Sequence, residues 1–358
     1  MASKIIKLLE TTDTILGVHR NYVFLSKKSQ FFCKLRVLGE LMLCIIFAKF
    51  LFDGFVLYTK IYLTFEIFSF ISSFNALFIL LSSIITSSTY KCFIENLLVV
   101  DSQYRYDLNY IKKSKKLELT IYIKIVLSCI VYATVLTTKI IFKLYLERKH
   151  YSTDEIFSLF CAVLTESRFI LRHVVVYGYI TMIKNLLECL NYSILDAQVK
   201  YKRKQTKLHS NSAKEDDQIS MEQIVIWATQ FQCLLNCSRN ASICFKVQAV
   251  MKQLVLFVIS YLMIYAVYCT YILMLAGQNL LNEASRLITR LSKLYILLSI
   301  HPDLPQRKAI RKFSALVKTN PIQIQYTTKM KLGKYLVPVI LSFSAFYIIT
   351  VLQYYHFI

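Results

Sequence analysis

The sequence predicts an all-α, polytopic membrane protein. Hydrophobic residues fill 56% of the 358 positions, and the mean hydropathy of +0.48 is far above that of an ordinary soluble domain. Glycine and proline occur only 6 and 4 times, which is too few for a protein built on tight turns. Long apolar helices therefore explain the composition best.

Four stretches are easy to place as membrane spans. Each is about 20 residues long or more, the length that a helix needs to cross a hydrocarbon core of about 30 Å. They cover residues 37–58, 61–85, 117–142 and 156–183.

The basic residues predict which connections face the cytosol. The net charge is +22, and residues 1–36, 86–116 and 184–247 carry seven, six and nine Lys or Arg. Cytosolic loops are rich in these residues, so we expect all three segments, the amino terminus included, in the cytosol and no nucleic-acid partner. Residues 1–36 lack the apolar core of a signal peptide. Within the third segment, residues 200–218 are charged and polar, as in a flexible loop.

The region of the fifth and sixth spans is compressed. Residues 243–276 form a nearly continuous apolar run of 34 residues, which as one straight helix would measure about 51 Å. Residues 277–334 carry eleven Lys or Arg, so the positive-inside rule demands one more crossing between about 222 and 280. Either residues 223–245 are a marginal fifth span, or part of the chain between spans five and six is missing.

The last 24 residues, 335–358, contain no Asp, Glu, Lys or Arg. As a helix they would be about 36 Å long, enough to cross the bilayer. Near their end, Tyr347 is followed by five mostly aliphatic residues and then by Gln353 and Tyr354. An amide in such a helix is costly unless it faces protein or water, so Gln353 is predicted to face a pore or the bundle interior.

This ending resembles the closing motif of insect gustatory receptors, a Thr-Tyr pair, five apolar residues and Gln-Phe. Tyr347 and Gln353 match the motif, whereas Phe346 and Tyr354 depart from it. The resemblance extends in outline over the chain, including the basic loop before span five and a helical extension at 221–244. It implies a seven-span insect chemoreceptor fold with the amino terminus inside, the carboxyl terminus outside, and the last helix of each subunit of a tetramer lining a cation pore.

The resemblance further implies a ligand-gated, nonselective cation channel opened by a tastant, and the departures favour a divergent, bitter-type member. The family's gate falls on Gln353 and Tyr354. Tyr347, Thr350 and Tyr354 recur at helical spacing on one face, with Gln353 beside it. Alternatively, Gln353 forms a hydrogen bond between helices.

The ligand pocket of the family lies in the outer half of the bundle formed by the earlier spans, and there we expect Glu66, Tyr132 and Glu166 to contact the ligand. A structural alternative is that Glu66 pairs with an arginine of span four, such as Arg172. Threonines near Tyr132 can likewise bond the backbone of their own helix.

The sequence predicts no enzyme, cofactor or metal site, because the six histidines are dispersed and no Gly-rich phosphate loop or zinc pattern is present. Expected partners are a small-molecule tastant, membrane lipid and further gustatory receptors in a homo- or hetero-tetramer, in the plasma membrane of a sensory dendrite. The chain forms one domain, 1–358, with a cytosolic tail (1–36), a ligand-binding bundle with its loops (37–334) and a pore helix (335–358). A G-protein-coupled receptor, a membrane transporter and a non-functional shortened receptor remain alternatives.

Overall fold

The computed structural model of the chain describes most of its helices. The described residues are 2–15, 18, 20, 22, 26–57, 74, 77–147, 153–208, 219–256, 263–298, 305–325, 331–333, 335–339 and 342. Within these ranges there is no strand, only an isolated antiparallel bridge between Gln325 and Lys331.

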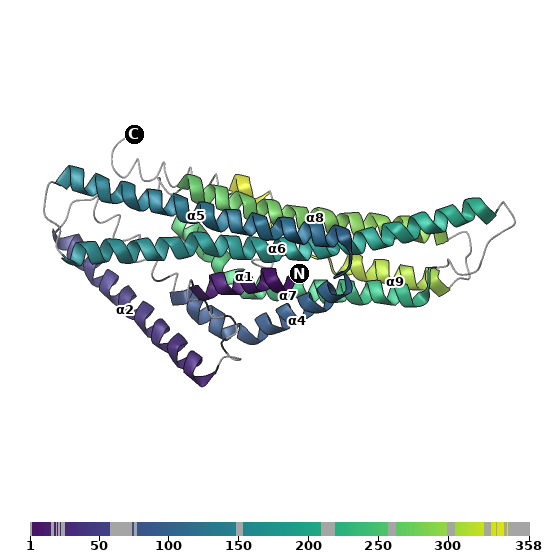
Figure 1. The fold of residues 1–358 in the computed structure, drawn as a ribbon, viewed down its shortest axis with the longest axis horizontal. Coiled ribbons are helices and arrows are strands. Elements are labelled where there is room, and N and C mark those ends of the chain that lie inside the picture. Colours follow the sequence, from purple (N-terminus) through teal and green to yellow (C-terminus); the bar gives the residue numbers. More distant parts are fainter. Residues whose placement is uncertain are drawn as a thin grey trace.

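The molecule is an elongated bundle of long helices (Figure 1). In chain order they are α1 (Ala2–Ile15), α2 (Lys27–Leu57), α4 (Ser87–Gln103), α5 (Leu108–Glu147), α6 (Thr153–Leu208), α7 (Met221–Leu256), α8 (Met263–Leu298) and α9 (Pro305–Thr319). Helix α6 is central and packs mainly on α8 and α5, while α7 packs on α4, α6 and α9. Helix α2 diverges from the bundle at one end, and α9 lies in the other half.

Among the described helices, none by itself combines the length and the hydropathy that a membrane crossing requires. One pair meets this requirement jointly, by length and composition: Leu77–Ile85 and Ser87–Gln103, which are bent by 66° relative to each other.

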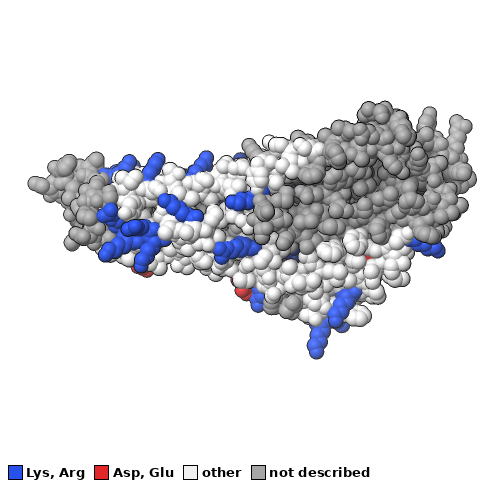
Figure 2. Space-filling view, turned by 180° about the vertical axis from the view of Figure 1, so that it is seen from behind, with Lys and Arg blue, Asp and Glu red and all other residues white. Residues whose placement is uncertain are grey.

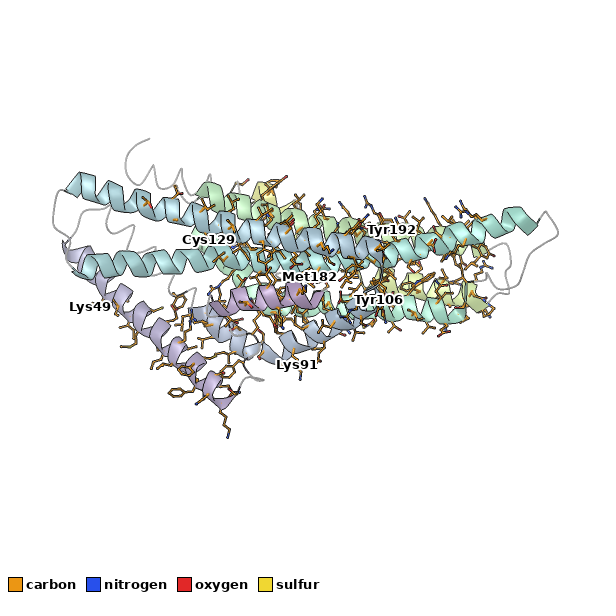
Figure 3. The ribbon with its side chains drawn as sticks, in the orientation of Figure 1. Lys49, Lys91, Tyr106, Cys129, Met182 and Tyr192 are labelled. Atoms are coloured by element: carbon orange, nitrogen blue, oxygen red, sulfur yellow. The ribbon has the colours of Figure 1, made fainter. Side chains whose placement is uncertain are left out.

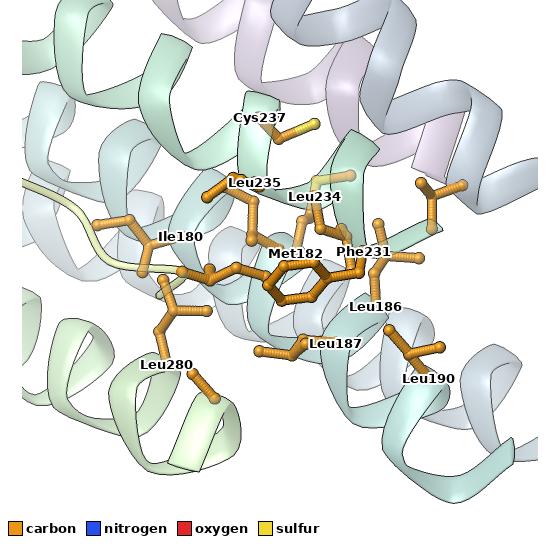
Figure 4. Close-up of a cluster of buried hydrophobic side chains, with 14 of the residues drawn as sticks. Ile180, Met182, Leu186, Leu187, Leu190, Phe231, Leu234, Leu235, Cys237 and Leu280 are labelled. Carbon is orange, nitrogen blue, oxygen red and sulfur yellow. The ribbon is translucent and has the colours of Figure 1, made fainter. Parts of the chain in front are cut away.

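The core lies where α6, α7 and α8 meet (Figure 4). Phe231 of α7 is fully buried, and apolar residues of α6 recur around it every three or four positions, which places them on one helical face. Labelled members of this cluster are Ile180, Met182, Leu186, Leu187, Leu190, Phe231, Leu234, Leu235, Cys237 and Leu280. The only tryptophan, Trp227, is 2% exposed and donates its indole N–H to the Ser193 hydroxyl at 3.0 Å, which joins α7 to α6.

Helices α5 and α6 extend well beyond the apolar spans that the sequence predicts. Helix α5 begins nine residues before the span at 117–142, and α6 continues 25 residues past the span at 156–183. The prediction of a flexible loop from residue 200 is therefore wrong for 200–208, which form the last turns of α6. Polar residues sustain this extension through pairs four positions apart, such as Asp196 and Lys200 at 2.8 Å. Residues 209–218 lie outside the described residues.

The apolar run at 243–276 is divided between two helices, because α7 ends at Leu256 and α8 begins at Met263. The additional membrane crossing that the charge distribution demands in this region stays a prediction. The predicted helical extension at 221–244 is also confirmed, as the first two-thirds of α7.

The amino-terminal segment, predicted only as a tail, contains the packed helix α1. Ile5, Ile6 and Leu9 are at most 5% exposed, and α1 packs chiefly on α6. A Cβ atom on Gly178 of α6 would come within 2.8 Å of the Leu9 side chain. The missing side chain of this glycine therefore allows α1 to lie close to α6.

Candidate functional site: the turn before the last helix

The predicted pore residues Tyr347, Thr350, Gln353 and Tyr354 lie outside the described residues, as does Glu66. Tyr132 and Glu166 belong to α5 and α6, but their side chains also lie outside the described part. The assignments of all seven to a pore or a pocket therefore stay predictions.

Neighbours of the predicted pocket residues are described. Thr134 and Thr137 of α5 are exposed and donate hydrogen bonds to the carbonyls of Ile130 and Ala133, at 3.0 and 2.8 Å. This is the backbone role that the sequence offered as the alternative to ligand contact. Arg172 of α6 is buried, at 4% exposure, as expected for an arginine that faces the bundle interior.

The described residues do include both ends of the turn that leads into the predicted pore helix, residues 320–325 and 331–333, which we call the return turn. It begins where α9 ends and folds back on itself, with the Leu332 amide donating to the Ile324 carbonyl at 2.8 Å. Leu336, just beyond the turn, donates its amide to the Gly333 carbonyl at 3.1 Å and is 5% exposed. The start of the last helix is thus folded against the protein.

Two serines of α7, one helical turn apart, hold the return turn through its backbone. The Ser238 hydroxyl donates to the Gln323 carbonyl at 2.6 Å, and the Ser242 hydroxyl accepts from the Gln325 amide at 3.0 Å. Because these partners are backbone atoms, they satisfy polar groups that a buried turn would otherwise leave unpaired. Nearby, Arg239 of α7 donates to the side-chain oxygen of Asn320 at 2.9 Å.

Helix α8 approaches the other side of the turn at Gly277. A Cβ atom there would lie 2.5 Å from Cγ of Leu332 and 2.7 Å from its carbonyl oxygen. Only glycine permits this approach, because the backbone oxygen cannot rotate away as a side chain can. Ser238 and Ser242 of α7 and Gly277 of α8 therefore contact the return turn from two different helices.

A second buried site ties the amino terminus to the bundle. Arg20 donates through Nε to the Asp13 carboxylate at 2.7 Å, and both side chains are 3% exposed. A further donor of Arg20, Nη1, lies 3.2 Å from the Cys244 carbonyl of α7. The guanidinium also lies over the rings of Phe245 and Tyr90, at 4.5 and 5.8 Å from their centroids.

Electrostatics keeps this arginine charged. Burial by itself would lower the pKa of Arg20, but the charge and hydrogen bond of Asp13 outweigh it and raise the pKa overall. The Tyr90 hydroxyl shares a hydrogen bond of 2.5 Å with the Tyr179 hydroxyl of α6, and burial raises the pKa of Tyr90. The cluster therefore contains one cation, neutral phenols and two acidic side chains, Asp13 and Glu10, of which Glu10 accepts from the Tyr90 hydroxyl at 3.4 Å.

Sequence reasoning missed both sites. Asp13 and Arg20 fall in the predicted tail, and their spacing of seven residues has no distinctive pattern. Ser238 and Ser242 could have been flagged by their helical spacing, and Gly277 as a glycine within a helical pattern, which often has a packing reason. Within the described residues, no group of three His, Cys, Asp or Glu could hold a metal ion.

No family model matches the sequence, and no curated protein is similar to it. Among solved structures, the chain is similar to the olfactory receptor OR5 of the insect Machilis hrabei, solved in complex with eugenol. The two share 12% sequence identity and a TM-score of 0.63, and the match covers 98% of each chain. At this identity the likeness establishes the fold. The chain therefore has the helical membrane-protein fold of an insect olfactory receptor.

Proposed function

We propose that this protein is an insect gustatory receptor, a ligand-gated, nonselective cation channel opened by a small organic tastant. The observation that carries the proposal is the full-length likeness to an insect receptor solved with a small organic molecule, eugenol. The gustatory assignment rests on Tyr347 and Gln353 of the closing motif.

The return turn supplies a physical route for gating in this proposal. A ligand can shift a conformational equilibrium only if it binds the two states with different affinities. Ligand binding among the outer parts of the bundle would shift α7 or α8, and the return turn held by Ser238, Ser242 and Gly277 would carry that shift to the last helix. There, Gln353 and Tyr354 of each subunit of a tetramer would form the constriction, with Tyr347 and Thr350 on the adjoining pore face.

Gln353→Ala tests the pore assignment. Loss of an amide from a ring of four changes how a passing ion is hydrated, so we expect altered permeation or gating in whole-cell recordings with unchanged surface expression. The matched control is Gln232→Ala, the same chemical change at an exposed position of α7, which should leave the currents unchanged. Unaltered currents in Gln353→Ala would count against a pore role.

The orientation of the last helix is tested separately. An epitope tag placed after Ile358 should be labelled on intact cells, because the proposed topology places the carboxyl terminus outside. Labelling of surface-expressed protein only after permeabilisation would contradict the chemoreceptor topology.

The competing classes give different results in the same cells. A G-protein-coupled receptor would show agonist affinity that depends on guanine nucleotides, and a transporter would show saturable uptake without conductance. A non-functional shortened receptor would fail to reach the surface or would give no ligand response.

A further inference from the structure

The exposed face of α5 changes from basic to apolar side chains within one helical turn. Lys112, Lys115 and Lys116 are exposed, and the same face continues into large apolar side chains that are also exposed. These are Leu119 at 60%, Tyr122 at 48%, Ile123, Val126 and Ile130 at 56% each, and Leu127 at 43%. A stripe of this kind is suited to contact with hydrocarbon, and the edge of such an apolar layer would fall between Lys116 and Leu119.

This edge places the lysines in the headgroup layer. At 1.5 Å per residue, Lys116 lies about 4.5 Å and Lys112 about 10 Å below Leu119 along the helix axis. The headgroup region adds roughly 5–8 Å on each side of the hydrocarbon core, and a lysine side chain can extend several ångströms further towards the membrane.

Beside these lysines, a tyrosine of α6 lies between two cations from different helices. Tyr192 is 46% exposed. Nζ of Lys113 from α5 lies 4.8 Å from its ring centroid, and Cζ of Arg290 from α8 lies 5.5 Å from it. Figure 3 labels Tyr192 where α5, α6 and α8 run together.

The acidic side chains in this area do not balance the cations. Glu188 already accepts from both Lys113 and Lys184, at 2.7 and 3.2 Å, and Asp196 pairs with Lys200. Arg290, by contrast, has a buried Nη1 atom without a hydrogen-bond partner among the described residues. Figure 2 shows the same imbalance on the opposite face, where basic side chains far outnumber acidic ones over the described part.

We propose that the surface formed by Lys112, Lys113, Lys116, Tyr192 and Arg290, called the Tyr192 surface, binds the phosphate headgroup of an anionic phospholipid. The exposed apolar stripe of α5 would take the acyl chains, and the cations below it would take the phosphate. Lysine and arginine bind phosphate oxygens through charge-assisted hydrogen bonds, and basic surfaces at the cytosolic edge of membrane helices attract anionic lipids. This inference does not depend on channel activity.

The test measures lipid binding to the purified full-length protein in detergent micelles. The probe is a fluorescent short-chain phosphatidylinositol phosphate, followed by anisotropy, with short-chain phosphatidylcholine and free inositol phosphate as competitors. We expect the unlabelled anionic lipid to displace the probe far better than phosphatidylcholine does, since only the former carries net negative charge. Free inositol phosphate should compete weakly, because it lacks acyl chains for the α5 stripe.

Two charge-removing pairs locate the site. Lys113→Gln with Arg290→Gln should weaken binding about 25-fold, at about 5-fold for each cation lost near the membrane surface. Lys112→Gln with Lys116→Gln should weaken binding by a similar factor. This double variant breaks no ion pair that the structure shows, so it tests the site even if the Lys113→Gln, Arg290→Gln variant does not fold. Fluorescence of the buried Trp227 checks folding in each case.

The matched control is Lys308→Gln with Lys312→Gln, two exposed lysines of α9. This change removes the same charge from another helix and should alter binding less than 2-fold. Equal weakening by the control would overturn the proposal, since it would indicate general attraction to a basic protein. So would equal displacement by phosphatidylcholine, or displacement by inositol phosphate as effective as that by the lipid.

Discussion

Replacing Arg20 by methionine should destabilise the protein by about 3–5 kcal/mol, because the change leaves the Asp13 carboxylate buried without its partner. Both side chains are 3% exposed in the wild type, so water cannot readily replace the guanidinium. The variant also loses the contact with the Phe245 ring at 4.5 Å, a desolvated cation–π interaction of about 2 kcal/mol. Methionine keeps much of the packing volume, so the cavity contribution is small.

A double variant separates the cost of an unpaired charge from the value of the pair. Asp13→Leu combined with Arg20→Met removes both buried charges, and such apolar replacements are often neutral or stabilising. We therefore expect the double variant to recover to within about 1 kcal/mol of the wild type.

The assay is unfolding by SDS in mixed detergent micelles, followed by the fluorescence of Trp227, which reports the α6–α7 interface. A cost below about 1 kcal/mol for Arg20→Met would refute the reasoning. A double variant no more stable than Arg20→Met would refute it as well.

The same assay serves three further predictions. Gly277→Ala should destabilise by about 1–3 kcal/mol, because its Cβ would press on the backbone of the return turn at 2.7 Å. The control Gly39→Ala, an exposed helical position with nothing within 4 Å, should instead gain about 0.5–1 kcal/mol. Partial burial would raise the pKa of Glu188, but its two lysine partners lower the pKa overall. The ionised Glu188 therefore stabilises the fold fully above the unfolded-state pKa of about 4.3, and this stabilisation is lost as the pH falls through the folded-state pKa. The difference in stability between the wild type and Glu188→Gln should accordingly shrink on acidification. Tyr104→Phe should cost about 1–2 kcal/mol, because it leaves Gln230 without a donor now at 2.7 Å, and an unchanged midpoint would contradict this.

Most of the helical framework could be predicted from the sequence. The apolar stretches at 117–142 and 156–183 correspond to parts of α5 and α6, because long apolar runs have few alternatives to a helix. Helix ends beyond the apolar layer were harder to predict. The polar turns of α6 up to Leu208 carry ion pairs such as Asp196–Lys200, and a hydropathy profile does not predict helix from such pairs.

The tertiary contacts at the candidate site could not be predicted in this way. The hydroxyls of Ser238 and Ser242 bond backbone atoms about 85 residues away in the chain, and no local pattern specifies such partners. The burial of Arg20 depends likewise on Phe245, which lies on α7. Charge counting addresses a different question, the number of membrane crossings between about 222 and 280, and that number stays a prediction.

The length of α6 has a mechanical consequence. Its 56 residues form one helix of about 84 Å, which acts as a lever. A tilt of only 3° about one end displaces the other end by roughly 4 Å, more than a hydrogen-bond length. Small rotations near Thr153 of a rigid α6 would therefore become large displacements near Leu208. Because α8 packs along α6, part of this displacement would reach the helix that touches the return turn.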